Sequence, residues 1–117
     1  MAQSEKAKTW EVFSLWVRLR DSYATTGTLT HCKCISCGEL FPFHRMHAGH
    51  FVGGRGNAVL FDQEICNAQC DVCNTHLGGN PEGYEQGLLS RGFTEDDLEA
   101  MKRKRHQTVK FTREHLI

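Results

Sequence analysis

Four of the six cysteines form two Cys-x-x-Cys pairs, Cys34 with Cys37 and Cys70 with Cys73. Two thiolates three residues apart can bind one ion if the backbone between them turns tightly, and Gly38 suits such a turn. Together the pairs supply four thiolates, which complete a tetrahedral zinc site and leave no position for water. We therefore predict a structural Zn²⁺ at these cysteines, and disulfides are the alternative interpretation.

The two pairs are separated by residues 38–69, so folding must close a long loop before the four ligands meet. Apparent binding free energies of structural zinc are roughly 10 to 16 kcal/mol, comparable to the whole stability of a small domain, so zinc can supply this closure. Cys32 and Cys66 fit one ion less well because of their spacing, and we predict that they are buried thiols outside the site.

Imidazole and carboxamide side chains are concentrated within and just after this loop. A neutral imidazole can accept a proton near neutral pH, and both groups can bind a divalent ion. Residues 44–62 are expected to form two short strands joined by the glycine-rich loop 53–57, and residues 71–77 a short helix. The resulting unit would be ββα-like. The side chains concerned are His44, His47, His50, Asn67, Asn74, His76 and Asn80.

The flanking segments have helical patterns. Apolar residues at steps of three and four predict a helix over residues 4–24 that starts at Ser4 and ends at Gly27. Its aromatic stripe is expected to pack in the core, although docking of a partner or a second copy is the alternative. Residues 28–43 suggest short β-type pieces, and residues 81–90 a helix. Thr94 and Asp97 resemble a capping box for a helix to about Gln107, and Thr112 a cap for a last turn.

The composition favours a single small domain. The chain has 117 residues, of which 39% are hydrophobic, and its formal net charge is zero. We expect an α+β domain over residues 1–117, made of an N-terminal helix (1–27), a zinc-stabilised core (28–80) and C-terminal helices (81–117). No apolar run is long enough to span a bilayer and no secretory signal is visible, so we expect an intracellular protein without membrane contact.

Several short motifs, in order, resemble the bacteriophage NinG (Rap) recombination-protein family, which is similar to the wider HNH or His-Me finger endonucleases. The motifs are His47-Ala-Gly-His50-Phe, Phe61-Asp62, Asn67-Ala-Gln-Cys70-Asp-Val-Cys73-Asn74 and Gly79-Asn80. The resemblance implies a ββα-metal site in which a histidine at the end of the first strand deprotonates water. The helix would supply ligands for one Mg²⁺ or Mn²⁺ ion on the scissile phosphate.

The resemblance assigns residues to these roles. It implies that His50 is the catalytic base, with core packing as the alternative, and that Asn67 orients it. The candidate ligands of the catalytic ion are Asn74, His76 and His47. Two positions depart from the family's pattern, because Gly49 stands where relatives often carry Asp or His, and Ile65 where they often carry Asn.

The function implied is a metal-dependent DNA endonuclease acting on branched recombination intermediates in a phage recombination pathway, in the host cytoplasm. The alternative is a catalytically inactive, zinc-stabilised DNA-binding or adaptor protein. A homodimer formed through the N-terminal helix is compatible with both. The basic run 102–105 can contact phosphates or simply form a solvated helix face. The candidate DNA contacts are Arg45, Arg55, Lys102, Arg103, Lys104 and Arg105.

Overall fold

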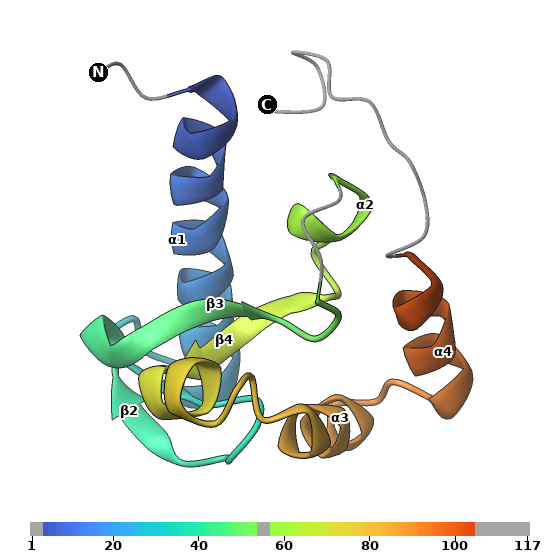
Figure 1. Cartoon of the computed structure of the whole chain (residues 1–117). Coiled ribbons are helices and arrows are strands. Elements are labelled where there is room, and N and C mark those ends of the chain that lie inside the picture. Colours follow the sequence, from blue (N-terminus) through green and yellow to red (C-terminus); the bar gives the residue numbers. More distant parts are fainter. Residues whose placement is uncertain (1–3, 54–56, 105–117) are drawn as a thin grey trace.

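The computed structural model describes residues 4–53 and 57–104 and has the expected α+β class, with helices around two small antiparallel sheets (Figure 1). No helix among these residues is long and apolar enough to cross a membrane. The elements in chain order are α1 (Glu5–Thr26), β1 (His31–Lys33), β2 (Leu40–Pro42), the 3₁₀ turn η1 (Phe43–Arg45), β3 (Met46–His50), α2 (Asn57–Leu60), β4 (Cys66–Cys70), the π-helical η2 (Val72–His76), α3 (Pro81–Ser90) and α4 (Glu95–Arg103).

The N-terminal helix begins and ends where the sequence predicts. The side chain of Ser4 accepts a hydrogen bond from the backbone N–H of Ala7 at 3.1 Å, which satisfies one of the free donors of the first turn. Gly27 ends the helix in the left-handed conformation, with φ of 72°, and its N–H bonds to the carbonyl of Tyr23. Both capping predictions are confirmed.

The predicted hairpin within residues 44–62 is wrong. β3 pairs antiparallel with β4, with Met46 opposite Cys70 and His50 opposite Cys66, and the chain between them forms the helical turn α2. The carboxylate of Asp62 accepts the backbone N–H groups of Glu64 and Ile65, and this turn directs the chain into β4. The second strand of the hairpin therefore contains the predicted zinc ligand Cys70 and the candidate residue Asn67.

The β3–β4 hairpin is a layer between two sets of helices (Figure 1). On one face α1 buries Val17 against Ala48 and Cys66, with the rings of Trp10 and Phe13 beside them. Further along α1, Trp16 is 42% exposed, so only part of the predicted aromatic stripe is core. The Trp16 ring is covered instead by the guanidinium of Arg20, whose Cζ lies 5.0 Å from the ring centroid.

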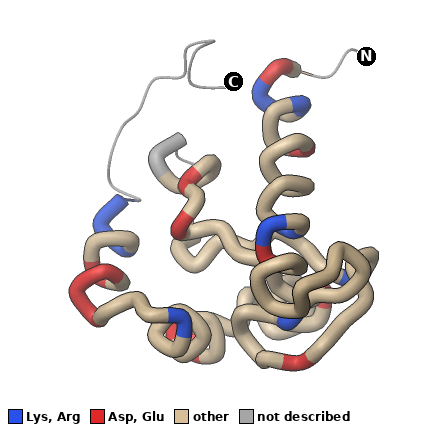
Figure 2. The backbone as a smooth tube through the Cα atoms, turned by 180° about the vertical axis from the view of Figure 1, so that it is seen from behind, with Lys and Arg blue, Asp and Glu red and all other residues tan. Residues whose placement is uncertain are grey.

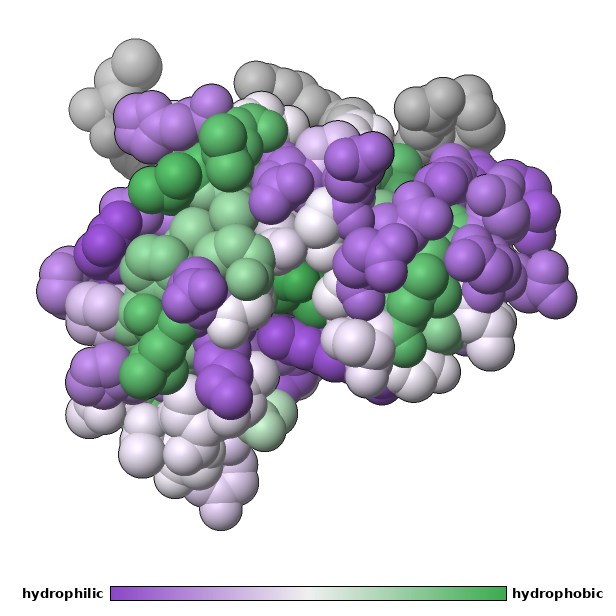
Figure 3. Space-filling model, turned by 90° about the horizontal axis from the view of Figure 1, so that it is seen from below, coloured by the Kyte–Doolittle hydropathy of each residue, from purple (hydrophilic) through white to green (hydrophobic). Residues whose placement is uncertain are grey.

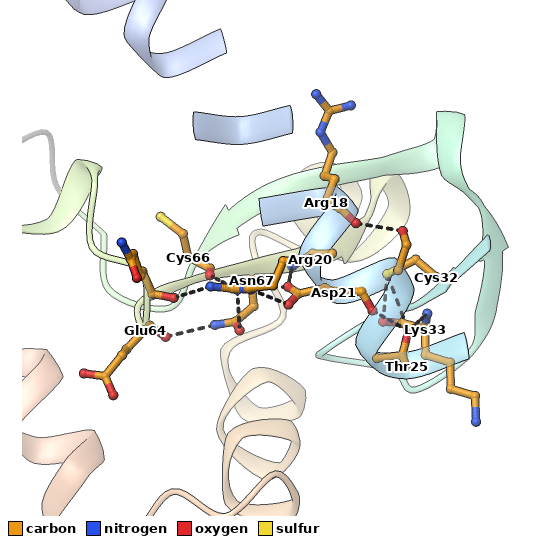
Figure 4. Close-up of polar contacts among 12 residues, drawn as sticks. Arg18, Arg20, Asp21, Thr25, Cys32, Lys33, Glu64, Cys66 and Asn67 are labelled. Carbon is orange, nitrogen blue, oxygen red and sulfur yellow. Dashed lines mark hydrogen bonds and ion pairs between the residues drawn. The ribbon is translucent and has the colours of Figure 1, made fainter. Parts of the chain in front are cut away.

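A polar network fixes α1 to the edge of β4 (Figure 4). The buried carboxylate of Asp21 accepts the backbone N–H of Ala68 at 2.7 Å and forms an ion pair with Arg20 at 2.8 Å. The same guanidinium donates to the carbonyls of Cys66 and Gln63. Because a buried carboxylate is costly without such partners, the network fixes the helix in one position on the hairpin.

The helices α3 and α4 cover the other side of the structure and confirm two further predictions. Residues 81–90 are helical, and Thr94 and Asp97 form a capping box at the start of α4. This helix ends at Arg103; the predicted continuation to Gln107 and the turn capped by Thr112 lie beyond the described residues. The apolar residues buried between these helices and the hairpin edge are Ile35, Val52, Val59, Ile65, Tyr84, Leu88, Leu98 and Met101.

Candidate metal centre and the adjoining histidine site

The four predicted thiolates converge on one point. Cys34 and Cys37 come from the turn between β1 and β2, Cys70 ends β4, and Cys73 lies in η2. Their sulfur atoms all lie within 4.8 Å of one another, and those of Cys37 and Cys70 are 4.0 Å apart. Four sulfurs bound tetrahedrally to zinc lie about 3.8 Å apart, given Zn–S bonds of about 2.3 Å. The cluster therefore fits a metal such as zinc.

Backbone N–H groups point at these sulfur atoms, as metal-bound thiolates require. The sulfur of Cys34 receives the N–H groups of Ser36, Cys37 and Cys70 at 3.3 to 3.5 Å, and that of Cys70 receives the N–H of Cys73 at 3.4 Å. Burial opposes ionisation of Cys34, but these bonds outweigh it and lower the pKa of that thiol. Burial, together with the charge of Cys34, raises the pKa of Cys37 to about 11.

Cys32 and Cys66 are both fully buried and neither belongs to the cluster, which confirms the prediction for these two residues. The thiol of Cys66 bonds weakly to the carbonyl of Leu60, and Thr25 donates to the sulfur of Cys32 at 3.8 Å. Burial raises the pKa of both thiols, so they stay protonated and behave as small apolar groups.

A second group of polar side chains lies where β3 and η2 meet, beside the cysteine cluster. The amide nitrogen of Asn74 is 2.9 Å from Nδ1 of His47. Next to them Asp71 forms two bonds with Arg45, at 2.9 and 3.2 Å, and the Arg45 guanidinium lowers the pKa of the carboxyl. We call His47 and Asn74 the His47–Asn74 site. Two of the three predicted ligands of a catalytic ion therefore meet.

The third predicted ligand does not join them. His76 is exposed, lies two residues beyond Asn74 and forms no hydrogen bond with His47 within the described chain. Asn80, one of the carboxamide side chains that follow the loop, caps helix α3. Its side chain accepts the N–H of Gly83 at the start of α3 and donates to the sulfur of Cys73 at 3.4 Å.

His50 does not face Asn74, contrary to the expected arrangement. Side chains alternate along a strand, so His50 lies on the face of β3 opposite to His47. Its ring stacks on Trp10 of α1 with centroids 5.2 Å apart, and its Nε2 lies 3.1 Å from the carbonyl oxygen of Leu60. The imidazole that the structure brings to Asn74 is that of His47.

Asn67 anchors the hairpin through hydrogen bonds to residues other than His50. Its amide donates to the carbonyl of Glu64 at 3.0 Å and to the hydroxyl of Tyr84 at 3.2 Å, and its oxygen accepts from Arg20. The Tyr84 hydroxyl in turn lies 2.7 Å from the carbonyl oxygen of Gly49. Asn67 therefore does not orient His50 by a hydrogen bond, as was expected. It joins the strands to α3 through Tyr84 instead.

Sequence reasoning missed Gln69, which explains why position 49 has no side chain. Gln69 is fully buried, and its amide nitrogen donates to Ser36 at 2.8 Å and to the carbonyl of Gly79 at 2.6 Å. A β-carbon at position 49 would overlap the Gln69 side chain. The Cys-x-x-Cys spacing gave no signal for this contact, which depends on the register of β3 and β4.

Three of the four predicted phosphate contacts that the structure describes already form ion pairs, and the fourth, Arg103, is exposed. Lys102 forms ion pairs with Glu99 at 3.4 Å and Glu85 at 3.9 Å, and Lys104 pairs with Asp62. Arg45 is bonded to Asp71 as described above, and Arg55 and Arg105 lie outside the described residues. Figure 2 shows Lys and Arg spread over several elements, with Asp and Glu at the start of α4 and basic residues at its end.

A family model described as "Bacteriophage Lambda NinG protein" matches residues 3–117. The chain is 34% identical to protein ninG of Escherichia phage 933W over 79 residues, which is 65% of this chain and 39% of that protein. It is 36% identical to protein ninG of Salmonella phage P22 over 76 residues, or 63% and 37% of the two chains. The match to protein ninG of Escherichia phage lambda is 33% over 79 residues. The chain thus spans about two fifths of the length of these relatives. No solved structure matches it.

Proposed function

The chain belongs to the bacteriophage Lambda NinG family, and from this premise we propose that it is a metal-dependent DNA endonuclease of the HNH type. The observation that carries the proposal is the contact between His47 and Asn74 at 2.9 Å. It places an imidazole from a strand against a carboxamide from the following helix, beside a cluster of four thiolates. Branched recombination intermediates are the first substrates to examine.

The order of the elements supports this proposal. β3, β4 and η2 stand in the order strand, strand and helix, with the short helical turn α2 between the two strands, and a ββα-metal unit has its strands and helix in this order. Cys70 ends the second strand and Cys73 lies in the helix, so a zinc ion would fix the junction from which Asn74 projects. With all four ligand positions filled by sulfur, that zinc would be structural.

Each side chain of the His47–Asn74 site has a distinct task in this proposal. A Mg²⁺ or Mn²⁺ ion held there would stabilise negative charge on the scissile phosphate and the leaving oxygen. Asn74 would supply an oxygen ligand once its amide turns, and His47 would bind the ion or accept the proton of the attacking water. Arg45, oriented by Asp71 through its Nε and Nη2 groups, would donate a hydrogen bond from its remaining N–H groups to a non-bridging phosphate oxygen.

The catalytic role first assigned to His50 stays a separate prediction. Its ring would have to leave the stack on Trp10 to reach the ion. We therefore assign the role of base or ion ligand to His47.

A nicking assay on supercoiled plasmid and on four-way junctions, with Mg²⁺ or Mn²⁺ added, tests the proposal. We expect cleavage by the wild type and a loss of at least about a hundredfold in His47→Ala and Asn74→Ala, the usual scale for a general base or an ion ligand. His44→Ala is the matched control, because His44 is an exposed histidine of η1 outside the site. Full activity in His47→Ala would contradict the proposal.

The second candidate, a DNA-binding or adaptor protein without catalysis, is favoured by one observation. Gly49 offers no ligand at the position next to His50, and His50 itself lies on the other face of the strand. Binding of DNA without any cut, with each divalent ion in turn, would select this function over the first.

A further inference from the structure

A groove of about 540 Å³ lies between the 34–38 turn and helix α3, away from the residues that the sequence assigned to DNA. Figure 3 shows the molecule from below, and in this view the surface is hollowed between its left and right parts. The lining residues include Thr25 from α1, Lys33 from β1, Ser36 from the turn, and Gln86, Ser90 and Arg91 from α3 and its end.

Two cations and two of the predicted zinc ligands, Cys34 and Cys37, line the groove. Lys33 and Arg91 project from different elements, both are exposed, and the lining includes neither Asp nor Glu. The other polar lining groups are hydroxyls and an amide, which can donate to phosphate oxygens. Such a surface suits an extended polyanion.

At least four of the eight other cations in the described chain form ion pairs, whereas no carboxylate pairs with the two cations of this groove. Arg20, Arg45, Lys102 and Lys104 each form an ion pair, and Arg18 lies over the ring of Phe43 and bonds to a backbone carbonyl. Lys33 and Arg91 form neither an ion pair nor a side-chain hydrogen bond with any described residue. A phosphate can therefore bind them without breaking an existing pair.

The walls of the groove pack closely against each other, which favours a preformed site. A β-carbon at Gly83 or Gly87 would overlap the backbone carbonyl of Ser36 or Ile35, so α3 packs directly on the turn. The turn is also held by the bond from Gln69 to Ser36 and by the N–H groups that point at Cys34. Little ordering would be needed on binding.

We propose that this groove binds the phosphodiester backbone of DNA through Lys33 and Arg91. This inference rests on the proposed function because it takes DNA as the ligand from it. It does not require that the protein cuts DNA. It moves the main phosphate contact away from the basic run 102–105, for which the sequence alone left a solvated helix face as the alternative.

The test measures the anisotropy of a short fluorescein-labelled DNA duplex over a range of salt concentrations, with no divalent ion added. The variant Lys33→Gln/Arg91→Gln should bind roughly tenfold more weakly, and the slope of log K against log salt should fall by about two. Lys33→Arg/Arg91→Lys should restore binding. Lys102→Gln/Arg103→Gln, the matched control, removes the same charge from α4 and should bind within about twofold of the wild type.

Three results would overturn the proposal. One is wild-type affinity in Lys33→Gln/Arg91→Gln, and the second is an equal loss in the α4 control. The third is a parallel loss of bound zinc in the groove variant, which would mean that the two cations only balance the charge of the thiolates. Because no divalent ion is added, this assay measures binding alone. If the protein binds DNA through the groove but does not cut it in the nicking assay, the nuclease proposal is refuted and this inference stands.

Discussion

Gly49 and Gln69 show how much the site depends on one cross-strand contact. The buried Gln69 amide joins the 34–38 turn, the Gly79 turn and the surface of β3 above Gly49. A side chain at position 49 therefore competes with Gln69 for the same space. The absence of a side chain at position 49 thus has a packing cause.

Gly49→Ala should lower the free energy of unfolding by about 1 to 3 kcal/mol, because the new methyl group overlaps Gln69. The same change in a Gln69→Ala background should cost much less, since the space is then open. Urea denaturation of the four proteins of this double-mutant cycle measures the coupling. Additive effects of the two substitutions would show that the contact is unimportant.

At the residue level, the sequence indicated those side chains whose chemistry is local. The cysteine spacing, the cap at Ser4 and the capping box at Thr94 depend on neighbours within a few positions, and all were predicted. The role of Gln69 and the facing direction of His50 were not, because both depend on which strand pairs with β3 and in which register.

Among the elements, the pairing of β3 with β4 is the main departure from expectation. The glycine-rich segment after His50 resembles a tight hairpin turn, whereas the chain continues through α2 and Asp62 before it returns. Local turn signals compete with the burial of Val59 and Ile65 in the core, and burial prevails. The sequence of the strand that results, Cys66–Cys70, alternates apolar and polar residues, yet the polar Asn67 and Gln69 are buried as well.

The cysteine cluster joins three of these elements and should be needed for folding. The ligands come from the β1–β2 turn, the end of β4 and η2. We predict one zinc per chain by native mass spectrometry, and unfolding on removal of the ion by a chelator, followed by circular dichroism. Apparent zinc-binding free energies of roughly 10 to 16 kcal/mol are as large as a small domain's stability of about 5 to 15 kcal/mol.

Cys70→Ser should therefore lose zinc and most of its ordered structure. Cys66→Ser is the matched control, because Cys66 is equally buried on the same strand but lies outside the cluster, and it should keep its zinc. Two zinc ions per chain, or zinc loss in the Cys66 variant alone, would contradict the four-ligand assignment.

For the molecule as a whole, the hairpin separates two chemically different sides. α1 covers one face with aromatic rings and with the ion pair between Arg20 and the buried Asp21. The other face meets η2 and α3 and carries the polar His47–Asn74 site. Val12 on the outer surface of α1 is 70% exposed and Tyr23 is 66% exposed. The homodimer expected through this helix stays a prediction. The chain also spans only about two fifths of its relatives' length, so the activities of whole relatives remain proposals for it.

The most direct test of this arrangement is to titrate the zinc-loaded protein with Mn²⁺ and follow its histidine and asparagine side-chain resonances by NMR. A bound Mn²⁺ ion broadens nearby resonances strongly. If the ion binds at the His47–Asn74 site, the ring signals of His47 and the amide signals of Asn74 should disappear first, while those of His50 and Trp10 persist. Selective broadening of His50 with Asn74 unaffected would contradict the account.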